Sequence, residues 1–156
     1  MTKNIATIIL LLLLEHSNAY GSDMQDGHAI KIALTSGKIA VVTEGKGEPR
    51  SVGSYSLRIY SATNPAFPYD DFIVGIVRPR DGFVERVAVH DIDEDGTAEI
   101  IVIIRNVGTG SYLSADAIQY RDKSLRLLGS VGGLEKDENP ILALKKAYRE
   151  APNKSL

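Results

Sequence analysis

The sequence lacks cysteine entirely among its 156 residues. The fold therefore cannot rely on disulfides, and the protein has no thiolate nucleophile. An excess of charge of one sign is also missing, since 18 Lys and Arg residues face 20 Asp and Glu residues, for a net charge of −2. Nothing in this balance favours binding to nucleic acid or to a membrane surface. The fold must be held together by its core.

No apolar run is long enough to span a membrane. The longest, residues 5–14, falls short of the about 20 residues that a bilayer core requires. It follows Lys3, and Ser17 and Ala19 then stand at the spacing that a signal peptidase accepts. This pattern predicts a secretory signal peptide over residues 1–19, cleaved after Ala19. A membrane anchor is the alternative, but no basic cluster follows the run.

Internal repeats and low-complexity linkers are absent as well. Without residues 1–19 the chain keeps 137 residues, which is the size of one domain. We therefore predict a signal peptide at residues 1–19 and a single domain at residues 20–156.

The mature part of the sequence consists of short runs rich in Val, Ile and Tyr, which are typical of β-strands. Tyr55, Leu57 and Ile59 alternate with polar or amphipathic residues, as in a strand with one buried face. Residues 99–105 are apolar on both faces, which predicts a central strand. About eight strands are expected, at residues 29–34, 38–44, 54–61, 72–78, 84–90, 98–106, 113–121 and 124–131.

Turn residues between the strands, and a switch of the apolar residues from strand spacing to helical spacing near the C-terminus, complete the predicted fold. Residues 35–38 and 121–124 connect neighbouring runs at hairpin spacing. Asn139 is a good N-cap and Pro140 suits the first helical position. Apolar residues then recur at helical spacing from Ile141. The sequence predicts an all-β fold, an antiparallel β-sandwich of about eight strands with a short C-terminal helix.

An acidic stretch precedes the predicted central strand. Asp91, Asp93 and Asp95 occupy alternate positions, followed by Gly96 for a sharp bend, and Glu99 stands at the ninth place. Such carboxylates converge on one point and supply the hard oxygen ligands that suit Ca²⁺. An EF-hand is excluded because the twelfth place is a valine and the flanking segments are strands. Two interpretations stay open: a structural Ca²⁺ site that pins two strands, or a solvated loop in which Glu99 points outward.

Two glycines, two hydroxyl residues and a tyrosine fill residues 108–112, which we call the tip. Gly108 and Gly110 allow backbone angles closed to other residues, so a hairpin turn is expected here. A turn alone does not account for Thr109, Ser111 and Tyr112 on the same tip. A tyrosine on a loop is a large, stiff group with a terminal hydroxyl, well suited to entering a partner's cleft.

The run VAVHDIDEDGTAEIIVIIRNVGTGSYLSADAIQY, preceded by GSYSLRIYS and DDFIVGIVRPRDG, resembles the periplasmic inhibitors of I-type (invertebrate) lysozymes of Gram-negative bacteria. The likeness is specific in the joint occurrence of the acidic stretch and the tip. Lysozyme inhibitors of this and related families share a loop motif, Ser-Gly-x-Tyr, that enters the lysozyme cleft. The matching positions are Thr109, Gly110, Ser111 and Tyr112. Thr109 departs from the motif, since it keeps the hydroxyl but adds a methyl group.

The resemblance implies a β-sandwich, a periplasmic location, an I-type lysozyme as partner and a homodimer. A lysozyme needs two carboxyl groups at the scissile bond, and we expect Thr109 and Tyr112 to hydrogen-bond to them. Gly110 would let the backbone descend without a clash, with Ser111 beside it. Arg105 would brace the loop or meet an acidic rim. This mechanism requires no cofactor.

Two other functions stay open. One is a Ca²⁺-dependent carbohydrate- or protein-binding module of the cell envelope, in which the acidic stretch matters more than Tyr112. The other is a secreted glycan hydrolase, which the sequence disfavours because it has no Gly-x-Ser-x-Gly nucleophile motif. The histidines of the mature chain, His28 and His90, are isolated. We therefore predict an inhibitor and not an enzyme.

Overall fold

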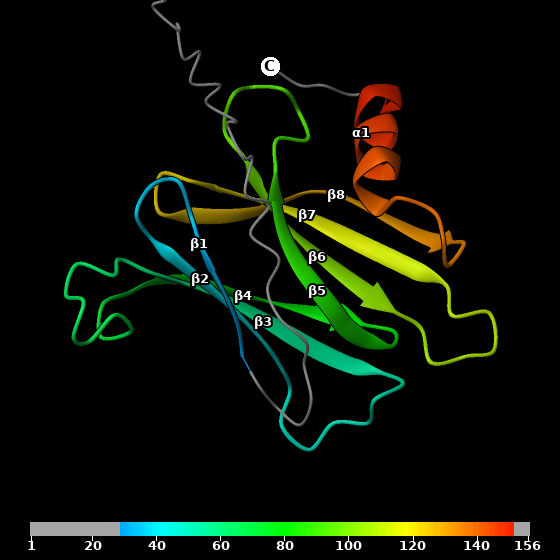
Figure 1. The fold of residues 1–156 in the computed structure, drawn as a ribbon, viewed down its shortest axis with the longest axis horizontal. Coiled ribbons are helices and arrows are strands. Elements are labelled where there is room, and N and C mark those ends of the chain that lie inside the picture. The colour runs from blue at the N-terminus through cyan, green and yellow to red at the C-terminus, as the bar shows by residue number, and fades with distance from the viewer. Residues whose placement is uncertain (1–28, 152–156) are drawn as a thin grey trace, which may run out of the picture.

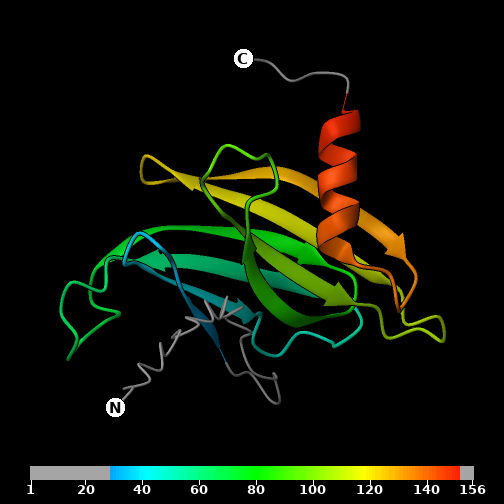
Figure 2. The ribbon, with the colours of Figure 1, turned by 45° about the horizontal axis from the view of Figure 1, so that its top comes forward.

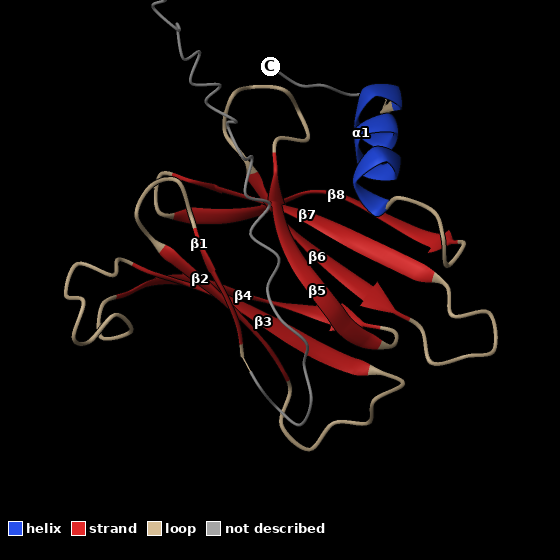
Figure 3. Cartoon of the chain, in the orientation of Figure 1, coloured by secondary structure: helices blue, strands red, loops and turns tan. Residues whose placement is uncertain are grey.

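The computed structural model describes residues 29–151, so the predicted signal peptide lies outside the described residues. This part of the chain forms eight strands and one helix (Figures 1 and 3). Every strand overlaps one of the predicted runs, and the predicted sandwich with its C-terminal helix is confirmed. The elements are β1 (Ile30–Ala33), β2 (Ile39–Glu44), β3 (Gly53–Tyr60), β4 (Phe72–Arg80), β5 (Phe83–His90), β6 (Glu99–Arg105), β7 (Leu113–Arg121), β8 (Ser124–Leu134) and α1 (Pro140–Glu150).

Two four-stranded antiparallel sheets stack on each other, in the orders β1-β2-β3-β4 and β5-β6-β7-β8 (Figure 1). Consecutive strands are neighbours within each sheet, and the chain passes from one sheet to the other once, between β4 and β5. At this crossing Gly82 has a φ of 118°, and a Cβ on it would lie 2.1 Å from the Arg105 carbonyl oxygen. Only glycine fits both the angle and the close approach.

The main core lies between the two sheets. Tyr55, Leu57 and Ile59 of β3 are fully buried in it, as their alternation predicted. The other buried members come from both sheets: Ile30, Ile32, Ala40, Val42, Val84, Val87, Ile100, Val102, Ile104 and Ile118.

β6 is apolar on both faces because each face has its own core. Ile101 and Ile103 belong to a second cluster, which includes Leu144 of α1. The helix lies over the outer face of the sheet β5-β6-β7-β8 (Figure 2). The helix begins as predicted, with the Asn139 side chain accepting hydrogen bonds from two amides of the first turn. Its Leu144 is buried against this second cluster. Among the described residues, no helix has the length and apolar character needed to cross a membrane.

A buried polar cluster joins the two sheets. Tyr55 Oη on β3 donates to Asp116 Oδ2 on β7 at 2.6 Å. Ser130 Oγ donates to the other oxygen of Asp116 at 2.5 Å, and Arg78 Nε lies 3.4 Å from Oδ2. Burial, and secondarily the charge of Asp116, raises the pKa of Tyr55 far above its ordinary value. The phenol therefore stays protonated and ties the sheets together.

Candidate functional site

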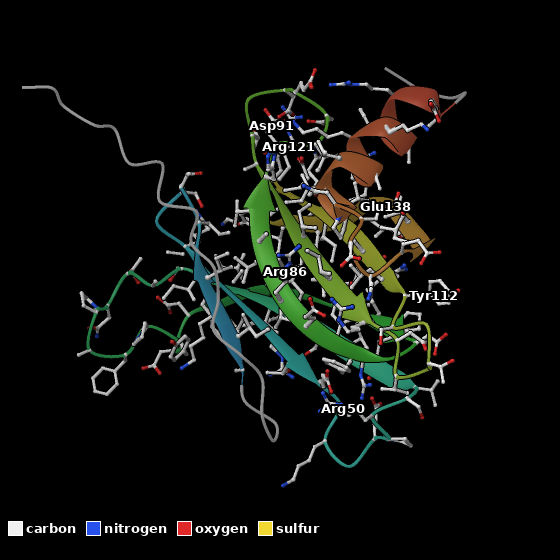
Figure 4. All side chains as sticks on the ribbon, turned by 45° about the vertical axis from the view of Figure 1, so that its right-hand side comes forward. Arg50, Arg86, Asp91, Tyr112, Arg121 and Glu138 are labelled. Carbon is white, nitrogen blue, oxygen red and sulfur yellow. The ribbon has the colours of Figure 1, made fainter. Side chains whose placement is uncertain are left out.

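The tip lies where predicted, between the end of β6 and the start of β7 (Figure 4). The Asn106 amide donates to the Tyr112 carbonyl at 2.9 Å, which closes the loop at its base. Further out, the Ser111 amide donates to the Gly108 carbonyl at 3.0 Å. The Gly108 amide in turn donates to Asn106 Oδ1 at 2.6 Å. The tip is therefore a hydrogen-bonded turn with a defined shape.

The two tip glycines do not have the backbone role that the sequence predicted. Neither Gly108 nor Gly110 has a positive φ, and the residue in the left-handed region is Ser111, with a φ of 48°. A side chain at residue 110 would displace the Tyr112 ring, since a Cβ there would lie 2.3 Å from its Cε2. The prediction was wrong about backbone angles. Gly110 instead leaves room for the tyrosine ring.

The tip protrudes from the sandwich. Thr109 is exposed, and 46% of the Tyr112 surface is exposed although one side of its ring lies against Gly110 (Figure 4). Within residues 29–151, the hydroxyls of Thr109, Ser111 and Tyr112 have no hydrogen-bond partner. The tip thus offers hydroxyl groups to the surroundings.

Arg105 braces the tip from the last position of β6. Its Nη1 donates to the Ser111 carbonyl at 2.9 Å. Its Nε and Nη2 pair with the Glu85 carboxylate on β5, which raises the pKa of Arg105. Of the two roles expected for Arg105, these contacts match bracing. The role of Glu85 was not predicted, because the sequence around Glu85 does not indicate that its strand pairs with the strand of Arg105.

A second loop, residues 45–52 between β2 and β3, lies near the same end of the sandwich. The Gly82 amide donates to the Ser51 carbonyl at 2.8 Å. Arg80, only 3% exposed, donates to the carbonyls of Pro49 and Arg50 at 3.1 and 3.2 Å. Arg80 thus holds this loop in place, a contact between distant segments that no sequence pattern marks.

The acidic residues lie at the other end of β6. One carboxylate oxygen from each of Asp91, Asp93 and Glu99 lies within 4.8 Å of the other two. Asp95 is not part of this group: its Oδ1 accepts a backbone hydrogen bond within the loop, and its Oδ2 lies 3.8 Å from Arg121 Nη1. The structure thus brings together three of the four predicted residues.

Glu99 is fully buried, so the alternative in which it points outward is wrong. Its Oε2 accepts a hydrogen bond from the Ile92 amide at 2.8 Å, whereas its Oε1 has no hydrogen-bond partner among residues 29–151. Asp91 Oδ1 is also buried without a partner. Burial, reinforced by neighbouring carboxylates, raises the pKa of Glu99 and of Asp93. Within the described part of the chain, Glu99 Oε1 and Asp91 Oδ1 are therefore buried without a hydrogen-bond partner, although the nearby Gln119 side chain partly offsets the rise in the pKa of Glu99.

Comparisons with known proteins agree with this architecture. A family model described as periplasmic lysozyme inhibitor of I-type lysozyme matches residues 26–148. The crystal structure of such an inhibitor from Aeromonas hydrophila is similar, with a TM-score of 0.71 and 44% identity over 76% of this chain and 99% of that chain. The A. hydrophila inhibitor in complex with Meretrix lusoria lysozyme matches with the same TM-score of 0.71 and 44% identity, over 76% of this chain and 96% of that one. Curated proteins give no match.

Proposed function

This chain belongs to the family of periplasmic lysozyme inhibitors of I-type lysozyme, and from this premise we propose that it inserts the tip into the lysozyme active-site cleft. The family consists of proteinaceous inhibitors, not enzymes. The proposal depends above all on the exposed, unpartnered hydroxyls of Thr109 and Tyr112 on a braced loop. The complex of the similar A. hydrophila inhibitor with Meretrix lusoria lysozyme supports an I-type lysozyme as the partner.

The chemistry of the tip suits a glycosidase cleft. A lysozyme uses two carboxyl groups that face the scissile glycosidic bond. A hydroxyl that donates to such a carboxylate takes the place of the sugar and satisfies the charge at the same time. Thr109 and Tyr112 supply two donors, and the Tyr112 ring adds the kind of stiff apolar contact that dominates many interfaces. Ser111 lies beside them and contributes its carbonyl to the brace.

The tip is shaped before any partner binds. Arg105 holds the Ser111 carbonyl, the Asn106 amide closes the base, and Gly110 seats the Tyr112 ring. The conformational entropy of these groups is therefore lost on folding, and their ordering does not reduce the free energy of binding.

The test removes one hydroxyl at a time. A hydrogen bond to a charged group contributes roughly 1.5 to 3 kcal/mol, so Tyr112→Phe and Thr109→Ala should each raise the inhibition constant about tenfold to a hundredfold. Both residues are exposed, so the melting temperature should stay the same. Unchanged inhibition of an I-type lysozyme by both variants would refute the assignment.

Matched controls make the same chemical changes elsewhere. Tyr69 and Thr35 are exposed residues outside the tip. Tyr69→Phe and Thr35→Ala should inhibit as the unmodified protein does. Chicken-type and goose-type lysozymes complete the assay, and we expect the I-type enzyme to be inhibited most strongly.

The proposed contact requires no cofactor. A cation in the acidic loop would act on the fold, since that loop lies at the opposite end of β6 from the tip. Inhibition should therefore be equal with and without a chelator. Loss of inhibition on chelation, together with indifference to Tyr112→Phe, would instead favour a Ca²⁺-dependent binding module.

The family is periplasmic, and we propose that residues 1–19 direct export. The N-terminal sequence of the periplasmic protein should then begin at Tyr20.

We also propose a homodimer, supported by Phe72 and Val77, which are 58% and 68% exposed on the edge strand β4. Sedimentation should show a dimer that Val77→Lys weakens. A monomer at every concentration would contradict this.

A further inference from the structure

We propose that the β5–β6 loop is a Ca²⁺ site with Asp91, Asp93 and Glu99 as its carboxylate ligands. The site is separate from the tip and serves the stability of the fold. Acidic residues in an exposed loop would not by themselves indicate a metal. The assignment depends on how two of these carboxylates are buried.

Two carboxylate oxygens in the group are buried and have no hydrogen-bond partner within residues 29–151. Glu99 has no exposed surface, and its Oε1 is unpartnered although Oε2 accepts the Ile92 amide. Asp91 Oδ2 accepts the Gly96 amide at 3.0 Å, whereas Oδ1 is unpartnered. Buried polar atoms normally have partners, and a buried charge without one is costly. A bound cation would be the missing partner of both oxygens.

The spacing of the oxygens fits one Ca²⁺ ion. Ligand oxygens lie about 2.3–2.6 Å from Ca²⁺, so two oxygens on the same ion are at most about 5 Å apart. The three carboxylate oxygens lie within 4.8 Å of one another. Mg²⁺ demands near-octahedral geometry and usually keeps several waters, so a cage of protein carboxylates suits Ca²⁺ better.

The surrounding residues hold the ligands in position. Gly96 and Glu94 have φ values of 87° and 62°, which fold the loop back on itself. The Glu94 side chain points away from the group and pairs with Arg149 of α1 at 2.5 Å. On the other side, Gln119 Nε2 of β7 donates to Asp93 Oδ2 at 3.4 Å. The loop is thus fixed between the sheet and the helix.

Ion binding at this loop would stabilise more than the loop. Ile92 lies between the ligands Asp91 and Asp93 and is buried in the same cluster as Leu144 of α1. A cation that fixes the loop also fixes Ile92 and, through it, the contact of the helix with the sheet.

The experiment uses protein purified from the periplasm and stripped of metal with EDTA. Calorimetry with CaCl₂ should show one site, with a dissociation constant of about 10⁻⁴ to 10⁻³ M, as in extracellular Ca²⁺ modules. Ca²⁺ at about ten times that constant should raise the melting temperature by about 5 °C. MgCl₂ at the same concentration should have a smaller effect.

Glu99→Gln and Asp91→Asn each remove one ligand charge with little change of shape, and both should abolish the rise. Asp91 is less buried than Glu99, so its variant keeps the test valid if Glu99→Gln does not fold. Asp81→Asn, in the exposed β4–β5 turn, is the matched control and should keep the full rise. Asp91→Asn should still inhibit I-type lysozyme, which separates this site from the tip.

Three results would overturn the assignment. The first is no heat and no change in melting temperature with CaCl₂ up to about 10 mM. The second is equal loss of the response in Asp81→Asn. The third, a response to MgCl₂ as large as that to CaCl₂, would overturn the choice of Ca²⁺.

Discussion

The two ends of β6 carry loops of opposite character. At one end the carboxylate of Glu99 is turned inward and fully buried. At the other end Tyr112 is turned outward, with its hydroxyl free of partners among the described residues. Both loops contain a non-glycine residue with positive φ, Glu94 in one and Ser111 in the other. In our two proposals, the direction in which the unpartnered groups face decides what each loop binds: a Ca²⁺ ion on the inside and a lysozyme on the outside.

The separation of the two loops has an energetic consequence. β6 has seven residues, which corresponds to about 20 Å of extended chain. Changes that far apart, without shared partners, usually have additive effects. Variants at the acidic end should therefore alter stability without altering inhibition, and variants at the tip should do the reverse.

The largest expected effect is at the acidic end. Ile92→Ala removes a buried side chain that packs in the cluster beneath α1. Such truncations cost about 2–5 kcal/mol because they leave a cavity. Urea unfolding should show this loss, while the folded protein should inhibit I-type lysozyme normally. A weaker inhibition constant for the folded variant would mean that the two ends are coupled.

Tyr112→Ala is the converse change. Truncation of a central aromatic contact costs about 2 kcal/mol or more, so the inhibition constant should rise at least about thirtyfold. The free energy of unfolding should change by less than about 0.5 kcal/mol, because the residue lies on the surface. A large loss of stability would show that Tyr112 serves the fold.

The tip glycines give a finer comparison. Gly110→Ala would place a Cβ against the Tyr112 ring and move it, so inhibition should weaken about tenfold. Gly108→Ala would meet only the end of the Asn106 side chain, which can rotate, and its effect should be smaller. Inhibition assays on both variants check this order, and the reverse order would contradict the seating of the ring on Gly110.

Arg105→Lys separates bracing from charge. Lysine keeps the charge but cannot bridge Glu85 and the Ser111 carbonyl at once. Inhibition should weaken about threefold to fivefold, since the loop becomes less ordered. Full inhibition by this variant would show that Arg105 contributes only its charge.

The smallest effect is expected at Asp95, which lies outside the three-carboxylate group. Asp95→Asn should leave the rise in melting temperature with CaCl₂ nearly unchanged, whereas Asp91→Asn should abolish it. Equal losses in the two variants would extend the ligand set to four residues.

The parts of the fold that follow from local patterns were predictable. The alternation of Tyr55, Leu57 and Ile59 gave the buried face of β3, and Asn139 gave the start of α1. The two apolar faces of β6 placed it at the centre of its sheet, as observed. The protrusion of the tip also followed from its composition, since polar and aromatic residues concentrated between two strands require a surface position.

Contacts between distant segments could not be predicted in the same way. Tyr55 and Asp116 are 61 residues apart, and Glu85 meets Arg105 only because β5 lies beside β6. The role of Gly110 was missed because it depends on the position of the Tyr112 ring, which the sequence does not give. Sequence patterns reveal faces and turns, while pairings across the sandwich require the fold.

The left-handed backbone of Ser111 sets the shape of the tip, which has a consequence for the kinetics of association with a lysozyme. A tip whose shape is already set needs no slow rearrangement before it docks, so encounter with the enzyme proceeds at a rate governed by diffusion and orientation. Different lysozymes would then be distinguished by residence time. The extra methyl group of Thr109 would act on the dissociation rate.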